Sequence, residues 1–242
     1  MNLIIPKWPA PNWVHAAVTT RDGGVSCAPY TSLNLGLHVG DDPQAVAINR
    51  ARLVTALNLP KEPLWLQQVH GCDTVYAEDS KDGCTADAIV ATEPGSVCAV
   101  LTADCLPILL CDQKNKRVGA VHGGWRGLLN GILESAITAL DTPAIDILAW
   151  LGPAIGPNAF EVGSEVRNAF LQQSLELSAA FAPSPRGLWL ANIYNIARYK
   201  LAKQGVNFIG GGDYCTVSDP KRFFSYRRDR ITGRMATLIW CK

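Results

Sequence analysis

The sequence lacks the features that place a chain in a membrane or on a nucleic acid. No apolar run is long enough to cross a bilayer, and the N-terminal stretch carries early prolines instead of the apolar core of a signal peptide. The formal net charge is only +1, whereas domains that coat nucleic acids are strongly basic. These absences predict a cytoplasmic protein that binds neither membrane nor nucleic acid.

Several common motifs are also missing. There is no CxxC pair, which removes the commonest structural zinc and thioredoxin-type signatures. Neither GxxxxGK[ST] nor GxGxxG occurs, so no P-loop or standard dinucleotide site is indicated. The eight cysteines are scattered, which makes a disulfide framework the weaker interpretation. No internal repeat or linker divides the 242 residues, so one domain over residues 1–242 is expected.

Apolar runs closed by glycine, proline or polar residues predict strands, and apolar residues at helical spacing predict helices. We expect the strands of residues 86–91 and 97–103 to be neighbours, and those of 106–111 and 118–121 to pair across the turn 112–117. The expected strands cover residues 14–20, 65–69, 86–91, 97–103, 106–111, 118–121, 145–151 and 234–241. The expected helices cover residues 43–57, the stretch from the Gly123–Gly124 turn to 140, about 163–173 and about 191–204.

Histidine is scarce, and two of the four histidines share one context. His70 and His122 each end an apolar run and are each followed by glycine, and Cys105 ends a third run. A cysteine and two histidines on a preformed scaffold are suitable ligands for zinc or copper, with a fourth position left open for catalysis. The three residues fit no short metal motif, so the interpretation as satisfied core residues stays open.

A metal-free interpretation uses the same residues. Cys105 would be a nucleophile, with His122 or His70 as its base. Asp104 next to the thiol is expected to raise the pKa of Cys105, and a bound cation would reverse that penalty. The sequence therefore favours a metal site over a free nucleophile.

Arginines next to glycine turns are candidates for binding an anion. Arg126 lies in the first turn of the helix after His122, and Arg21 precedes Gly23 and Gly24. The C-terminal segment carries basic residues interleaved with Phe223, Phe224 and Tyr226, and it predicts either phosphate or base binding or a solvated face. Its basic residues are Lys221, Arg222, Arg227, Arg228, Arg230 and Arg234.

Motifs along nearly the whole chain resemble those of the YfiH-like family. Members of this family carry three kinds of name: multicopper polyphenol oxidase or laccase, purine nucleoside phosphorylase, and peptidoglycan editing factor. The most specific are QQVHG, LTADCLPILL and AVHGGWRG. The matching stretches are Thr19–Arg50, Gln67–Gly71, Ala86–Val90, Leu101–Leu110, Ala120–Gly127, Leu151–Gly163 and Cys215–Trp240.

The resemblance implies an α+β fold, a single compact domain with mixed sheets covered by helices in α/β/β/α-like layers. It also implies that one zinc is held by His70, Cys105 and His122, which would form the catalytic centre. One departure is Gly123, where the family usually has alanine, and this change removes no ligand.

The implied activity is phosphorolysis of adenosine, inosine and methylthioadenosine, with adenosine deamination in addition. Zinc with three protein ligands leaves a site for a water of lowered pKa, which suits deamination. Phosphorolysis needs cationic groups near the ribose, so Arg21 and Arg126 are the candidates, with Asn34 as a polar partner for sugar or base. The expected partners are thus a purine nucleoside and phosphate, and the sequence sets no oligomeric state.

Three alternatives remain. Copper in the same His₂Cys site would give a laccase-like polyphenol oxidase, although His15 and His38 are too few for a second copper centre. A metal-free Cys-His hydrolase acting on cell-wall precursors is another. A noncatalytic zinc-binding or partner-binding protein is the third.

Overall fold

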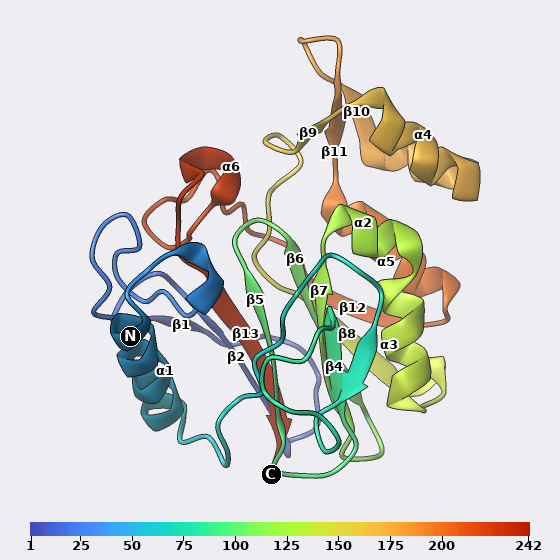
Figure 1. Ribbon diagram of the computed structural model, residues 1–242. Coiled ribbons are helices and arrows are strands. Elements are labelled where there is room, and N and C mark those ends of the chain that lie inside the picture. Colours follow the sequence, from blue (N-terminus) through green and yellow to red (C-terminus); the bar gives the residue numbers. More distant parts are fainter.

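Two facing β-sheets form the centre of the molecule, and helices cover their outer faces (Figure 1). The computed structural model describes residues 1–242. One sheet has the strand order β1-β2-β13-β5, and all its neighbours are antiparallel. Its strands are β1 (Leu3–Ile4), β2 (Val14–Thr19), β13 (Met235–Cys241) and β5 (Val97–Thr102).

The second sheet has six strands in the order β12-β8-β6-β7-β4-β3. Its two edge strands run parallel to their neighbours and its inner strands are antiparallel, so the sheet is mixed. Its strands are β12 (Phe208–Gly211), β8 (Ile147–Leu151), β6 (Leu106–Asp112), β7 (Val118–Gly123), β4 (Ala88–Ala91) and β3 (Thr74–Tyr76).

Apolar side chains fill the space between the sheets and the space under the helices. Cys98, Leu109 and Ile239 are fully buried in the cluster between the sheets. Helix α1 (Pro43–Leu57) packs Leu53 onto the outer face of the four-stranded sheet. The outer face of the six-stranded sheet is covered by α2 (Trp125–Asn130), α3 (Ile132–Leu140) and α5 (Ile193–Lys203). These α/β/β/α layers confirm the predicted α+β fold class.

A smaller unit projects beyond one end of the two sheets (Figure 1). It contains the antiparallel sheet β10-β11-β9, helix α4 and the 3-10 helix η3. Its elements are β9 (Glu161–Val162), α4 (Ser164–Gln173), η3 (Leu175–Ala180), β10 (Phe181–Pro183) and β11 (Trp189–Ala191). The remaining short helices are η1 (Leu37–Val39), η2 (Ala144–Asp146) and α6 (Tyr226–Asp229).

Most of the expected elements are present, and the predicted pairing of residues 106–111 with 118–121 is confirmed as β6 and β7. The predicted helix 43–57 is α1, which begins at Pro43 because Asp42 accepts a hydrogen bond from the backbone N–H of Gln44. All eight cysteines are free thiols. No helix is both long enough and apolar enough to cross a membrane.

Three expectations about individual elements were wrong. Residues 65–69 form no strand: Gln67 makes one isolated bridge with Thr85, and the segment is followed by β3, which was not expected. Strands β4 and β5 are not paired, because they belong to different sheets that face each other. The single helix expected after Gly124 is two helices, because Gly131 has a φ of 98°, which ends α2 in a left-handed conformation.

Candidate metal centre

His70, Cys105 and His122 are far apart in the sequence, and the fold brings their side chains together. Their ligand atoms all lie within 4.8 Å of one another, and Cys105 Sγ is 3.6 Å from His70 Nε2. Cys105 lies in the turn between β5 and β6, His122 lies in β7, and His70 lies in the segment that leads to β3. The expectation that these three side chains converge is therefore met by the geometry.

One pair of donor atoms has the spacing that a tetrahedral zinc site requires. Zinc binds sulfur at about 2.3 Å and imidazole nitrogen at about 2.0–2.1 Å, which places two such donors about 3.5 Å apart in a tetrahedron. The separation of 3.6 Å between Cys105 and His70 agrees with this value. The three residues thus fit a metal ion, and the same N and S donors also suit copper.

Asp87 holds both histidines, and its role could not be read from the sequence alone. Its side chain is fully buried, and Oδ1 lies 2.7 Å from His122 Nδ1 and accepts a hydrogen bond from the backbone N–H of His70. The N–H groups of Val69 and Gly71 donate to the other oxygen. Burial acts to raise the pKa of Asp87, but its hydrogen bonds with His122 and these backbone groups outweigh burial and lower it.

The bond to Asp87 also selects the free nitrogen of His122. With Nδ1 bonded to the carboxylate, Nε2 is the nitrogen available to a metal, which is the arrangement that fixes the tautomer of metal-binding histidines. The turn around His70 has a φ of 61° at that residue, and its three consecutive N–H groups point at Asp87. One carboxylate therefore orients two of the three candidate ligands.

Gly124 allows the three side chains to approach each other. A Cβ atom added there would lie 2.8 Å from His70 Cδ2 and 3.5 Å from Cys105 Sγ. Gly123, the departure from the usual family motif, lies within β7, where a Cβ atom would meet Ile108 Cδ1 at 2.7 Å and the Leu106 carbonyl oxygen at 2.9 Å. In this chain an alanine at 123 would therefore require the Ile108 side chain and the β6 backbone to shift.

The electrostatics of the group differ from the sequence-based expectation. Burial raises the pKa of Cys105, but the neighbouring imidazoles of His122 and His70 outweigh burial and lower it to about 6. The expectation that Asp104 would raise the pKa of Cys105 was wrong, because the pKa is lowered and the two histidines are the cause. The Asp104 carboxylate accepts hydrogen bonds from Thr216 Oγ1 and from the backbone N–H of Arg227, which hold it in other contacts.

A cavity of about 560 Å³ opens above the three residues. Apolar and aromatic side chains such as Trp125, Ile155, Phe160 and Ile193 form part of its wall. The charged lining residues outside the candidate metal group are Asp104, Arg126, Arg227, Arg230 and Arg234. The cavity thus combines a metal-capable group, apolar surface and an excess of positive charge.

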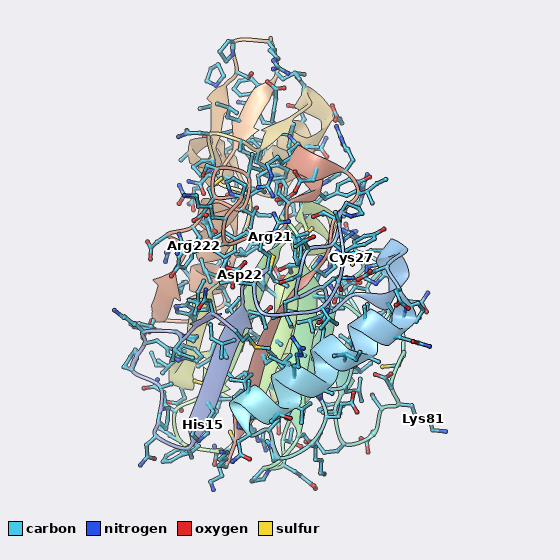
Figure 2. All side chains as sticks on the ribbon, turned by 90° about the vertical axis from the view of Figure 1, so that its left-hand side faces the viewer. His15, Arg21, Asp22, Cys27, Lys81 and Arg222 are labelled. Carbon is cyan, nitrogen blue, oxygen red and sulfur yellow. The ribbon has the colours of Figure 1, made fainter.

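Of the three predicted substrate-binding residues, only Arg126 lines this cavity. The Arg21 guanidinium donates to the carbonyl oxygens of Thr31 and Pro220 and stacks on the ring of Phe224, and Figure 2 shows it on the loop after β2.

Asn34 is likewise outside the cavity. It is fully buried, and its amide holds the backbone of Gly36 and Arg234 and the carboxylate of Asp41. Both Arg21 and Asn34 therefore support loops and do not reach the cavity.

The C-terminal basic segment divides into two parts. Arg227, Arg230 and Arg234 line the cavity together with Tyr226, whereas Phe223 and Phe224 are fully buried in the core. The other basic residues lie elsewhere: Lys221 is exposed, Arg222 pairs with Asp219, and Arg228 pairs with Asp229. The segment therefore contributes both a solvated face and part of the pocket.

Comparisons with known proteins agree with the motifs. The family described as multi-copper polyphenol oxidoreductase laccase matches residues 15–242. Purine nucleoside phosphorylase YfiH of Shigella flexneri is 53% identical over 239 residues, which cover 98% of both chains. Purine nucleoside phosphorylase PA4543 of Pseudomonas aeruginosa is 52% identical over 238 residues, which cover 98% of this chain and 97% of the relative.

Solved structures show the same fold. The crystal structure of a Neisseria meningitidis protein of family DUF152 superposes with a TM-score of 0.96 at 46% identity, and the match covers 100% of both chains. The agreement in sequence and in structure over almost the whole length shows that this chain belongs to the YfiH-like family.

Proposed function

We propose that this protein is a zinc-dependent purine nucleoside phosphorylase that converts adenosine, inosine and methylthioadenosine to the free base and the sugar 1-phosphate. One observation carries the proposal: a single cavity contains the His70, Cys105 and His122 group together with four arginine side chains. Relatives that are about half identical to this chain are named purine nucleoside phosphorylases, which supports the same reaction class.

His70, Cys105 and His122 would hold the metal, and Asp87 would keep the two histidines in place. When bound, zinc would supply a Lewis acid at the floor of the cavity. Side chains of the protein would position the nucleoside and the phosphate. The apolar wall around Trp125 and Phe160 suits a purine ring, and the arginines supply the positive charge that a phosphate co-substrate needs.

Phosphorolysis replaces the bond between the ribose carbon and the base nitrogen with a bond to a phosphate oxygen. Positive charge grows on the sugar ring as the base departs, so a phosphate held beside the ring stabilises the transition state. Adenosine deaminase activity is proposed as a side activity of the same centre, because three protein ligands leave a coordination position free for water.

The laccase-like alternative is not favoured by the donor inventory. A multicopper oxidase needs a histidine-rich cluster beside its His₂Cys site. His38 is the only further histidine that lines the cavity, and one imidazole does not make such a cluster. His15 pairs with Trp240, which in turn pairs with Val97 at the start of β5, whereas Cys105 follows the other end of that strand. His15 therefore lies at the opposite end of the sheet (Figure 2). Copper in the same three-ligand site remains compatible with weak oxidation of phenols.

A metal-free Cys-His hydrolase acting on cell-wall precursors is the second candidate, and it is favoured by the contact of Cys105 Sγ with His70 Nε2 at 3.6 Å. A noncatalytic zinc-binding or partner-binding protein is the third. Substitution separates these functions. Cys105→Ala should lose metal and activity together in a zinc enzyme, whereas retained metal with lost activity would indicate a nucleophile.

The direct test is incubation with adenosine and phosphate, with and without a chelator, followed by chromatography of the products. Free adenine and ribose 1-phosphate, formed only when the metal is present, are expected. Metal analysis of the purified protein should find about one zinc per chain. Unchanged nucleoside in every condition, or several coppers with blue absorbance, would contradict the proposal.

A further inference from the structure

The cavity contains more positive charge than its carboxylate balances. Arg126, Arg227, Arg230 and Arg234 line it, and Asp104 is the only carboxylate that does. None of these four arginines takes part in any of the eight salt bridges of the molecule. A group of guanidinium ions without carboxylate partners repels itself, so its natural complement is an anion.

Three of the four arginines lie close together in the sequence, on α6 and the loop that leads to β13. This segment is fixed at both ends by its backbone. The N–H of Arg227 donates to Asp104 at 2.6 Å, and the N–H of Arg234 donates to Asn34 at 2.9 Å. Asp104 precedes Cys105 directly, so the arginine segment is tied to the turn that carries the thiol.

The side chains differ in how far they are already engaged. Arg227 and Arg234 each use one terminal nitrogen, Nη1, to donate to backbone carbonyl oxygens. Arg230 makes no side-chain hydrogen bond and is exposed. Its backbone has φ 63° and ψ −64°, a conformation that costs energy for any residue with a Cβ atom. The Arg230 guanidinium lies 5.9 Å from the centroid of the Tyr226 ring and has no hydrogen-bond or carboxylate partner. Backbone strain of this kind clusters at active sites and ligand-binding residues.

We infer that Arg227, Arg230 and Arg234 form a subsite for a phosphate dianion, with Arg230 as its principal ligand. That this anion is the co-substrate of phosphorolysis rests on the proposed function. Arg126 lies on α2, an element separate from α6 and the loop after it, and is not included in the subsite. The planar guanidinium fork suits two oxygens of one phosphate at once.

Binding of inorganic phosphate alone tests the inference without any nucleoside. Calorimetric titration of the metal-loaded and the chelator-treated protein separates the arginine subsite from direct binding to the metal. Arg230→Ala should weaken phosphate binding about tenfold or more in both forms, because it removes charge-assisted hydrogen bonds. Arg230→Lys should recover part of the affinity, since it keeps the charge and loses the fork. Metal content and melting temperature should stay unchanged in both variants.

Lys221→Ala is the matched control, because Lys221 is an exposed cation six positions before Arg227 and lies outside the cavity. It should leave phosphate binding unchanged. Equal weakening by Arg230→Ala and Lys221→Ala, or no phosphate binding by the wild-type protein, would overturn the subsite.

Kinetics distinguish failure of the subsite from failure of the proposed function. If the protein phosphorolyses adenosine and Arg230→Ala leaves the KM for phosphate unchanged, the subsite is refuted and the function stands. If phosphate binds in an Arg230-dependent way and no nucleoside is cleaved, the subsite stands and the proposed function is refuted.

Discussion

At the scale of single residues, the candidate centre depends on groups that are not ligands themselves. Asp87 is fully buried, and its carboxylate makes four hydrogen bonds, to His122 Nδ1 and to three backbone N–H groups around His70. The carboxylate thereby fixes the ring of His122 and the backbone that presents His70. Such an outer partner contributes to metal binding without touching the metal.

Asp87→Asn should therefore weaken metal binding by about 10–100-fold. The amide offers one acceptor oxygen where the carboxylate offers two, and its NH₂ group faces donors. Competition with a chromophoric chelator measures the affinity. Asp73→Asn is the control, because Asp73 is exposed and its side chain makes no hydrogen bond, so its metal affinity should match the wild type. Equal affinities for all three proteins would show that Asp87 has no such role.

Substitution of Gly124 tests whether the His70 imidazole must keep its present position to bind a metal. The φ of −66° and ψ of 154° at Gly124 are allowed for alanine, so a substitution acts through the added methyl group alone. That methyl would lie 2.8 Å from His70 Cδ2 and must displace the imidazole. Gly124→Ala should lower metal content well below the wild type under the same loading, as measured by elemental analysis. A fully loaded variant would show that His70 does not need its present position.

At the scale of elements, the sequence predicts the features that neighbouring residues determine, such as helix starts and tight turns. Asp42 and Pro43 mark the beginning of α1, and the polar turn between Asp112 and Arg117 joins β6 to β7, as expected. Which strands share a sheet depends on contacts between distant segments. The pattern of apolar residues therefore could not separate β4 from β5, which lie in opposite sheets.

The same limit applies to the candidate site. The strand-end positions of Cys105 and His122, together with the motif resemblance, were enough to predict that they converge with His70. Asp87 looked like part of a buried strand, and its four hydrogen bonds exist only because the turn after Val69 folds over it. Arg21 matched the expected pattern of an arginine before glycines, but tertiary contacts direct its side chain to backbone carbonyls.

The β6–β7 turn gives a prediction about stability. Asp112 is buried, and its carboxylate accepts hydrogen bonds from Lys114 N–H, from Asn115 and from Thr142 Oγ1. Burial acts to raise the pKa of Asp112, and these hydrogen bonds outweigh burial and lower it. Asp112→Asn should lower the free energy of unfolding by about 1–3 kcal/mol at neutral pH.

The pH dependence follows from the direction of this shift. A carboxylate whose pKa is lower in the folded state stabilises the fold above its unfolded pKa, and it loses that contribution as the pH falls through the folded pKa. The difference between wild type and Asp112→Asn should therefore narrow below about pH 4. Urea unfolding of both proteins at neutral pH and below about pH 4 measures this difference in the free energy of unfolding. Asp141→Asn, at an exposed carboxylate, is the control and should change stability by less than about 0.5 kcal/mol. If the difference in the free energy of unfolding between wild type and Asp112→Asn stayed constant across pH, the lowered pKa of Asp112 would be contradicted.

At the scale of the whole molecule, the candidate centre lies where the two sheets are joined. Strand β5 belongs to the four-stranded sheet and β6 to the six-stranded one, so the turn that carries Cys105 crosses from one sheet to the other. His122 lies in β7, and His70 lies in the segment before the edge strand β3. An ion held by all three residues would add direct bonds between segments that packing and hydrogen bonds already hold together.

Removal of the metal should therefore destabilise the whole fold as well as abolish activity. A ligand present at about 100 times its Kd stabilises the folded state by about 2.7 kcal/mol. For a domain of this size that corresponds to a melting temperature higher by about 5–10 °C. Calorimetry with and without a chelator measures the shift, and Cys105→Ala should show none because it lacks the sulfur ligand. If the wild-type protein loses its metal and keeps its melting temperature, the ion does not link the two sheets. His70, Cys105 and His122 would then not be joint ligands of one ion.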